Sequence, residues 1–308
     1  MSRKRRAAPR IPALSPRYWA LRGGLSVLRA FTYLPYPVLL ALGNAAGWLA
    51  YYLMPTRRRV AQINVRLCFP DLDGGEQVRL ARRAFMSGAI AVFETGLAWW
   101  ASDARLRKLV RYEGSENLAR AREHGCGVFL LGGHYTTLEL SGRLMCLFVD
   151  DINPIYKPAG NALFNMLMTR YRARIYDSLL INTEMRAMLR ALREGKVIWY
   201  APDQDFGRRR SVFAPFMGIN AATLTMTSRL AQRARAPVLP YYSERLPGTQ
   251  GYVIRVGPPL DNFPSGDDVA DATAINRAIE VQVRRTPEQY LWGHRRFKTR
   301  PPGERKLY

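Results

Sequence analysis

Short apolar runs alternate along this chain with longer segments in which apolar residues recur every three or four positions. The short runs predict buried strands at 110–113, 127–131, 152–156, 197–201, 238–243 and 251–256. The periodic segments predict helices at 77–100, 116–123, 136–147, 162–172, 184–193, 224–235 and 268–285. Strands that alternate with helices are typical of an α/β fold. We therefore predict a central mixed, largely parallel, twisted sheet flanked by helices.

A different pattern precedes these elements: residues 30–54 form a run of 25 residues without a charged side chain. As one helix this run would be ~37 Å long, against ~30 Å for the hydrocarbon core of a bilayer. Trp48 near its end suits a membrane interface, whereas Pro35 and Pro37 weaken a straight span. The run predicts a membrane-anchoring helix; a helix lying on an anionic leaflet and a buried helix of a soluble domain are the alternatives. We divide the chain into 1–55, a basic tail with this anchor, and 56–308, the α/β domain.

The composition narrows the class of partner. Of the 308 residues 48% are hydrophobic, and 47 Lys and Arg against 24 Asp and Glu give a formal net charge of +23. This charge predicts an anionic partner, which could be a nucleic acid, an acidic membrane, a phosphorylated substrate or an acidic carrier protein. The sequence has no zinc-ligand spacing, helix-turn-helix pattern or RNA-binding aromatic signature, so we expect no nucleic acid. Cys68, Cys126 and Cys146 are widely spaced and predict neither a disulfide framework nor a metal site.

The chemistry is expected where the predicted strand 127–131 ends, in Gly132-Gly133-His134-Tyr135-Thr136-Thr137-Leu138-Glu139. His134 is one of three histidines, and imidazole is the side chain suited to proton transfer near neutral pH. Residues five apart diverge by roughly 140° on one regular helix. His134 and Glu139 meet only if His134 lies in the turn and the helix begins at about Thr136. Glu139 would then accept a hydrogen bond from one imidazole nitrogen; the alternative is a carboxylate that only caps the helix.

A second polar cluster, Asp203-Gln204-Asp205, follows the predicted strand 197–201. In open α/β sheets, ligands bind beyond the carboxyl ends of the strands. The two carboxylates could bind a metal, orient a basic residue or cap the next helix. Because no third ligand lies nearby in the sequence, we predict no metal.

Several motifs in these segments match one family. They are Gly133-His134-x4-Glu139, Tyr156-Lys157-Pro158, Asn161-Ala162-Leu163-Phe164, Ala201-Pro202-Asp203-Gln204-Asp205-Phe206-Gly207, Val212-Phe213-Ala214-Pro215-Phe216, and the closing run from Pro287 to Pro301 that contains His294-Arg295-Arg296-Phe297-Lys298-Thr299-Arg300. Over nearly its whole length the chain resembles the late acyltransferases of bacterial lipid A biosynthesis, the lauroyl/myristoyl type. It departs from the family at Ala159-Gly160, where polar residues usually precede the asparagine.

The resemblance implies a glycerolipid-acyltransferase-like fold and a fatty acyl transfer. The donor would be an acyl carrier protein thioester, and the acceptor the 3-hydroxyl of an acyl chain on an anionic, Kdo-bearing lipid A precursor. His134 and Glu139 would form the catalytic dyad, with no cofactor. The protein would lie in the bacterial inner membrane with its catalytic domain facing the cytoplasm.

The resemblance also implies substrate-binding residues, which lie in the matched motifs and beside the cleft. They are Lys157, Asn161, Arg170, Asp203, Asp205, Arg295, Arg296 and Lys298. For the C-terminal basic residues a solvated or headgroup-contacting face is the alternative, and the run Arg3–Arg6 would be an electrostatic tether to the membrane. Three other functions stay open: an acyltransferase acting on another glycolipid or aminolipid, a non-catalytic membrane scaffold, and a nucleic-acid-binding protein.

Overall fold

The computed structural model describes residues 18–308, so the run Arg3–Arg6 lies outside the described part. Its helices are α1 (Trp19–Phe31), α2 (Tyr36–Leu53), α3 (Pro55–Cys68), α4 (Gly74–Trp100), α5 (Asp103–Arg107), α6 (Ser115–Arg122), α7 (Leu138–Met145), α8 (Ala162–Arg172), α9 (Met185–Arg193), α10 (Met226–Ala234), α11 (Asp268–Arg285) and the 3₁₀ turn η2 (Pro287–Gln289). Its strands are β1 (Val110–Glu113), β2 (Val128–Leu131), β3 (Ile152–Tyr156), β4 (Leu180–Ile181), β5 (Val197–Tyr200), β6 (Ser211–Phe216), β7 (Ile219–Leu224), β8 (Val238–Arg245) and β9 (Tyr252–Val256).

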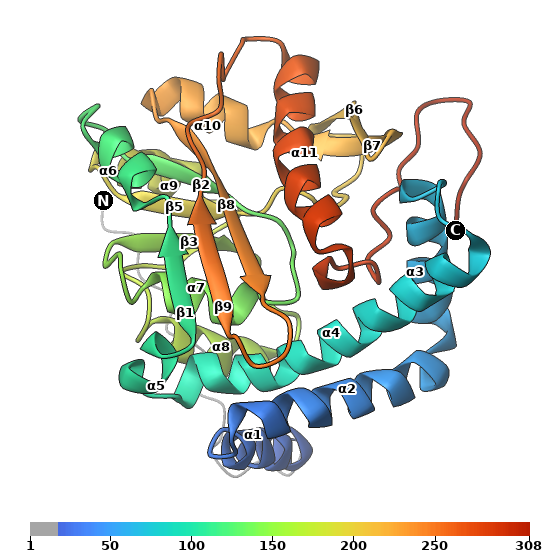
Figure 1. Ribbon diagram of the computed structural model, residues 1–308. Helices are drawn as coiled ribbons and strands as arrows, with labels where there is room; N and C mark the ends of the chain where they lie inside the picture. Colours follow the sequence, from blue (N-terminus) through green and yellow to red (C-terminus); the bar gives the residue numbers. More distant parts are fainter. Residues whose placement is uncertain (1–17) are drawn as a thin grey trace.

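The central sheet has seven strands in the order β1-β9-β8-β2-β5-β3-β4. The β8–β9 pair is antiparallel, and every other neighbouring pair is parallel. This confirms the predicted mixed, largely parallel sheet. Helices lie on both sides of it (Figure 1).

The core is divided between the two faces of the sheet. Phe129 and Leu131 of β2 belong to one buried cluster with residues of α9, α10 and α11. Val128 and Leu130 belong to a second cluster with residues of α6 and α7. Because successive side chains of a strand point to opposite faces, one short apolar strand supplies both layers. Burial on both faces explains why the predicted strands appear as continuous apolar runs.

Three strands escaped prediction: the two-residue strand β4 at the edge of the main sheet, and the pair β6 and β7. β6 and β7 pair antiparallel as a hairpin outside the main sheet, joined by Met217 and Gly218. Both joining residues have positive φ, 51° and 79°, which suits a tight hairpin turn. Methionine is not a turn signal, and Pro215 inside β6 argues against a strand. The predicted helix 224–235 correspondingly begins later, at Met226.

The helix predicted over 30–54 is divided in two. α1 ends at Phe31 and α2 begins at Tyr36, after Pro35 as its N-cap. Within residues 18–308, no single helix combines the length and apolar composition needed to cross a bilayer. Only α2 and α3 taken together meet both requirements, and their axes are bent by 97°. The single membrane-anchoring helix is therefore not confirmed.

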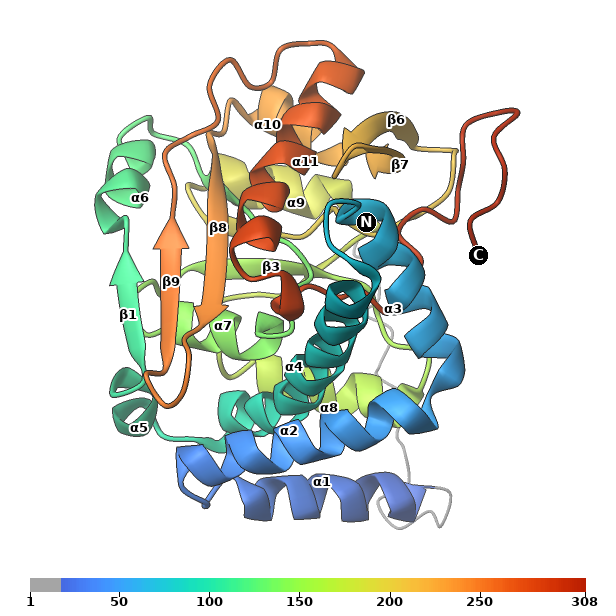
Figure 2. The same ribbon diagram turned by 45° about the vertical axis from the view of Figure 1, so that its right-hand side comes forward.

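The α2 helix packs along α4, beside α1 (Figures 1 and 2). Two glycines of α2, Gly43 and Gly47, face α4 in this contact. A Cβ atom built on Gly47 would lie 2.3 Å from the Cα of Met86, closer than two non-bonded carbon atoms can approach. The glycine therefore permits the two backbones to touch, and residues 36–53 form a layer of the folded body.

We expect Gly47→Ala to lower the thermal midpoint of unfolding in detergent solution. The added methyl group must push α2 from α4, which costs about 1–3 kcal/mol. The matched control is Gly88→Ala in α4, where a Cβ meets nothing within 4 Å. Alanine there should be neutral or stabilising by up to about 1 kcal/mol. Equal midpoints for both variants would contradict this account of the helix contact.

Candidate active site

His134 lies where β2 and β5 end side by side. The parallel register pairs Leu131 with Tyr200, and the Gly132 N–H donates to the Tyr200 carbonyl over 2.9 Å. The turn passes so close to β5 that a Cβ on Gly132 would lie 2.8 Å from the Trp199 ring. The α7 helix begins at Leu138 with Thr137 as N-cap, which confirms that His134 lies in the preceding turn.

The carboxylate that holds His134 is Asp203, from the turn after β5. The Nδ1 atom of His134 lies 2.6 Å from Oδ1 of Asp203, and the His134 backbone N–H donates to Oδ2 over 2.9 Å. The Asp203 side chain is 1% exposed and the His134 side chain 27%. Burial alone raises the pKa of the Asp203 carboxyl, but the interactions with His134 and the charge of Arg296 outweigh burial and hold that pKa well below its ordinary value. Asp203 is therefore anionic and fixes the imidazole with Nε2 left free.

Glu139, predicted to accept a hydrogen bond from His134, has other partners. The Trp99 indole N–H donates to its Oε1 over 2.8 Å, and the Arg172 guanidinium donates to both its oxygens, with Nε 3.1 Å from Oε1. The reason is geometric: Glu139 is the second residue of α7, and the helix directs it towards α4 and α8. Burial alone lowers the pKa of Arg172, but the hydrogen bond and charge of Glu139 outweigh burial and raise it. The predicted hydrogen bond between His134 and Glu139 is therefore wrong, and the carboxylate beside His134 is that of Asp203.

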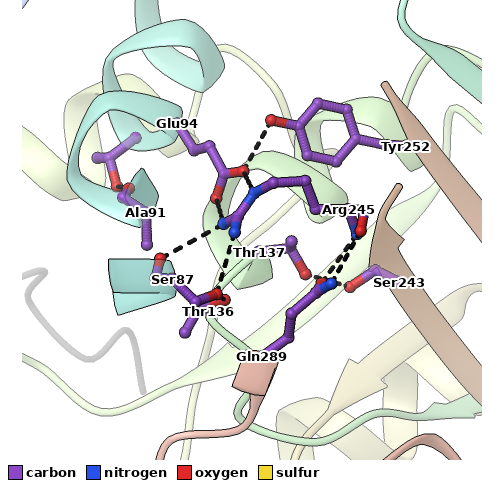
Figure 3. Close-up of polar contacts among 10 residues, drawn as sticks. Ser87, Ala91, Glu94, Thr136, Thr137, Ser243, Arg245, Tyr252 and Gln289 are labelled. Carbon is purple, nitrogen blue, oxygen red and sulfur yellow. Dashed lines mark hydrogen bonds and ion pairs between the residues drawn. The ribbon is translucent and has the colours of Figure 1, made fainter. Parts of the chain in front are cut away.

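A buried polar network joins α4 and β8 to Thr136, in the turn that contains His134 (Figure 3). Glu94 of α4 and Arg245 of β8 form a bidentate ion pair with N–O distances of 2.6 and 2.9 Å. Arg245 also donates to the Ser87 hydroxyl over 3.0 Å, and that hydroxyl lies 2.7 Å from the Thr136 hydroxyl. Burial lowers the pKa of Arg245, but Glu94 outweighs it and keeps the guanidinium charged. The network therefore connects α4 and β8 to a residue two positions after His134.

The C-terminal segment holds the same turn from another side. The Thr136 N–H donates to the Gln289 carbonyl over 2.7 Å, and the Leu291 N–H donates to the His134 carbonyl over 3.1 Å. The Gln289 side chain makes two hydrogen bonds of 2.8 Å to the backbone of Arg245 (Figure 3). Segments far apart in sequence thus fix the backbone of the histidine turn.

His134 opens into a cavity of about 290 Å³. Most of its lining is apolar and comes from β3, α7, α8 and the end of β5; it includes Leu138, Met145, Ile152, Ile155, Met168 and Phe206. Lys157, Arg172 and Gln204 also line it. The indole N–H of Trp199, another lining residue, is buried and has no hydrogen-bond partner among residues 18–308. The site therefore joins an imidazole, two cationic side chains and a free N–H donor to an apolar pocket.

The structure separates the residues predicted on and before α8. Lys157 lines the cavity, as expected for a residue beside the cleft. Asn161 instead caps α8, because its side chain accepts from the Phe164 N–H over 3.0 Å. Arg170 is exposed and does not line the cavity, whereas Arg172, two residues later, does. Residues 170 and 172 lie on different faces of a helix, but the sequence does not show which face of α8 is turned towards the cavity.

Asp205 and Arg296, both predicted to bind substrate, are engaged within the fold instead. Asp205 accepts hydrogen bonds of 2.6 and 2.8 Å from the backbone and hydroxyl of Thr299. Arg296 is 2% exposed and donates to the Ala222 carbonyl and the Thr223 hydroxyl over 2.7 and 3.0 Å. Their polar groups therefore connect the C-terminal segment to the β5 turn and to β7.

Arg295 and Lys298, the other predicted residues of the C-terminal segment, are exposed. They line neither the cavity that contains His134 nor a second cavity, which lies beyond Phe206. Within residues 18–308, no group of three or more His, Cys, Asp and Glu side chains is placed to hold a metal ion.

The chain is similar to proteins of known families over almost all of its length. The family model for bacterial lipid A biosynthesis acyltransferases matches residues 9–299. The chain is 40% identical to the lipid A biosynthesis palmitoleoyltransferase of Escherichia coli (strain K12), and 37% identical to the lauroyltransferase of that strain. Both alignments cover 96% of each protein. Identity to the myristoyltransferase of that strain is 28%, over 95% of this chain and 91% of the relative.

The buried ion pair in this network gives a test of stability. We expect Glu94→Gln to destabilise the fold by about 3–5 kcal/mol, because it leaves the buried Arg245 charge without its carboxylate. The matched control is Asp103→Asn, which breaks an ion pair with Arg143 in which the aspartate side chain is 62% exposed. That change should cost no more than about 1 kcal/mol. Thermal midpoints of the two variants in one detergent measure the difference, and equal losses would contradict it.

His294 predicts how stability depends on pH. Its Nε2 accepts a hydrogen bond from the Asp205 N–H over 3.2 Å, and burial lowers its pKa below the ordinary 6.5. A folded-state pKa below the unfolded value means that protons favour the unfolded chain, so stability is complete above about pH 6.5 and falls below it. We expect the wild-type thermal midpoint to drop more steeply between about pH 7 and 5.5 than that of His294→Gln, whose amide accepts the bond without titrating. The control His124→Gln, which changes an exposed histidine, should keep the wild-type dependence of the midpoint on pH. The same dependence in His294→Gln would contradict the prediction.

Proposed function

The chain belongs to the bacterial lipid A biosynthesis acyltransferase family, and from this premise we propose its reaction in detail. It transfers a fatty acyl group from an acyl carrier protein thioester to a hydroxyl on an acyl chain of a Kdo-containing lipid A precursor. The observation that carries the proposal is the imidazole of His134, held by a buried anionic carboxylate and open to an apolar cavity. No cofactor is needed for this transfer.

His134 acts as the general base. An alcohol is a weak nucleophile until its proton is removed, and Nε2 is the imidazole nitrogen that Asp203 leaves free. Asp203 accepts from Nδ1–H, selects the tautomer with an unprotonated Nε2, and stabilises the imidazolium that forms. The hydroxyl oxygen bonds to the thioester carbon, and the C–S bond then breaks. The proton held by His134 goes to the leaving thiolate.

Glu139 acts through Arg172 in this proposal. The attacked thioester carbonyl becomes an oxyanion, and catalysis requires donors placed where that charge develops. We assign this role to two donors that line the cavity, the Arg172 guanidinium and the indole N–H of Trp199, which has no hydrogen-bond partner among residues 18–308. Since Glu139 accepts from both Nε and a terminal nitrogen of Arg172, it fixes the plane of the guanidinium.

The surface of α1 and α2 supports a membrane location. It exposes a group of large apolar side chains: Trp19, Val27, Val38, Trp48, Leu49 and Leu53. Exposed apolar patches of this kind are typical of membrane or protein contacts. We place this face in the bacterial inner membrane, with the catalytic domain in the cytoplasm, where the basic chain meets the anionic lipid and the acidic carrier. An acyltransferase for another glycolipid or an aminolipid is the alternative.

The base assignment predicts specific losses of turnover. His134→Ala should abolish transfer from acyl carrier thioester to the tetra-acylated precursor. Asp203→Asn should lower kcat by about 10²–10⁴-fold, with little change in the KM for the acceptor, because the amide no longer selects the reactive tautomer. The assay is product formation by mass spectrometry, and His124→Ala, an exposed histidine, is the matched control.

Circular dichroism spectra must match the wild type, so that a lost fold is not counted as lost chemistry. If the folded Asp203→Asn variant turns over at the wild-type rate and Glu139→Gln does not, then Glu139 and not Asp203 is the carboxylate that assists His134. Transfer by wild type to an aminolipid, and none to the lipid A precursor, would favour the alternative acceptor.

A further inference from the structure

A second cavity, of about 720 Å³, lies beyond Phe206. Residues of the β5–β6 connection, β6 and α10 form much of its wall. Asn182, Tyr200 and Phe206 line both this cavity and the smaller one that contains His134. A molecule bound in one cavity therefore adjoins a molecule or chain bound in the other.

The second cavity is strongly cationic. Four arginines line it, Arg209, Arg210, Arg229 and Arg233, and Asp268 is the single carboxylate in its lining. Asp268 is already paired, because the Arg229 guanidinium donates to its Oδ2 over 2.8 Å. Within residues 18–308 the other three arginines form no ion pair, and all three are exposed. Three positive charges therefore remain uncompensated around one concave space.

Neutral hydrogen-bond donors lie in the same wall. The Ser211 hydroxyl is buried and has no hydrogen-bond partner in the described part of the chain. Thr225 and Met226, the N-cap and first residue of the nine-residue helix α10, also line the cavity. Amide groups at a helix N-terminus donate readily to anions and carry partial positive charge. The wall thus combines guanidinium groups, a free hydroxyl and helix amides, which together suit phosphate oxygens.

We propose that this cavity binds a phosphate monoester on the sugar headgroup of the acyl acceptor, a deduction that rests on the proposed function. The volume lies in the range of about 300–1,000 Å³ that is typical of sites for small molecules. A folded carrier protein presents a convex surface and would contact the rim, whereas a phosphorylated sugar can enter. The reacting hydroxyl lies on an acyl chain, so the headgroup must bind beside the catalytic pocket, and the shared wall at Phe206 provides that arrangement.

The test is binding of a phosphorylated lipid without turnover. The full-length chain with His134→Ala is titrated in detergent micelles with tetra-acylated lipid A precursor carrying its phosphates, and with the same lipid after phosphatase treatment. Adding Arg209→Gln, Arg210→Gln and Arg233→Gln should weaken binding of the phosphorylated lipid at least about tenfold, since each guanidinium–phosphate contact is charge-assisted. Binding of the dephosphorylated lipid should stay within about twofold.

The control removes the same charge elsewhere. Arg83, Arg111 and Arg277 are exposed, line neither cavity and form no ion pair within residues 18–308, so their triple Gln variant should bind both lipids as the parent does. Equal weakening by the two triple variants, or equal weakening towards both lipids, would overturn the proposed phosphate site. The same three cavity substitutions are then made in the active enzyme, which keeps His134. If they raise the KM for the carrier thioester and leave the KM for the acceptor unchanged, the phosphate site is overturned in favour of carrier docking.

These outcomes separate the site from the reaction. If the wild type transfers acyl groups but the three cavity substitutions do not weaken binding of the phosphorylated lipid, the phosphate site is wrong and the proposed reaction stands. If the three substitutions abolish phosphate-dependent binding but the wild type transfers no acyl group, the phosphate site stands and the proposed reaction is wrong.

Discussion

The parallel register between β2 and β5 determines where the imidazole and its carboxylate meet. Leu131 and Tyr200 are paired at the ends of these strands, and His134 and Asp203 each follow three residues later. Equal offsets from a shared strand end bring the two turns together, so a hydrogen bond of 2.6 Å forms between residues 69 positions apart. A shift of the register would separate them, and the buried Asp203 would lose the interactions that keep it anionic. The chemistry of the site therefore depends on backbone pairing in the middle of the sheet.

The same pairing explains what sequence reasoning could and could not predict. The apolar runs were enough to find six of the strands of the main sheet. Among the three histidines, the position of His134 in the turn after a predicted strand was enough to select it as the candidate base. Strand order is a long-range property, and without it nothing shows that the 203–205 turn lies beside the 132–137 turn. Local spacing therefore favoured Glu139, five residues from His134 in the chain, although the α7 helix directs that carboxylate to Trp99 and Arg172.

Charge was also an incomplete guide to the candidate site. The C-terminal motif suggested a substrate-binding cluster, but Arg296 is buried over the Phe216 ring, with its guanidinium carbon 5.3 Å from the ring centroid. Its role is to attach the last segment to β7, and that segment in turn holds the His134 turn through Gln289 and Leu291. Two arginines of the second cavity, Arg209 and Arg210, belong to the run 208–210, which gave no signal beyond the general basic excess. Their significance follows from the absence of ion pairs at Arg209 and Arg210 within residues 18–308, which only the fold reveals.

Acyl transfer to a charged lipid has two opposing requirements, an apolar pocket for the reacting acyl chains and a polar space for the charged headgroup. In the proposed reaction, the charge that develops as the alcohol attacks is stabilised by fixed groups such as Asp203 and Arg172, which act with little screening in a low-dielectric pocket. A phosphate group cannot enter such a pocket without losing its hydration, which is costly unless several cations replace the water. Under the proposed function, separate but adjoining spaces meet both needs, because the apolar lining beside His134 suits acyl chains and the arginines of the second cavity are exposed to water. Phe206, which lines both, marks the boundary at which an acceptor would change from sugar to hydrocarbon.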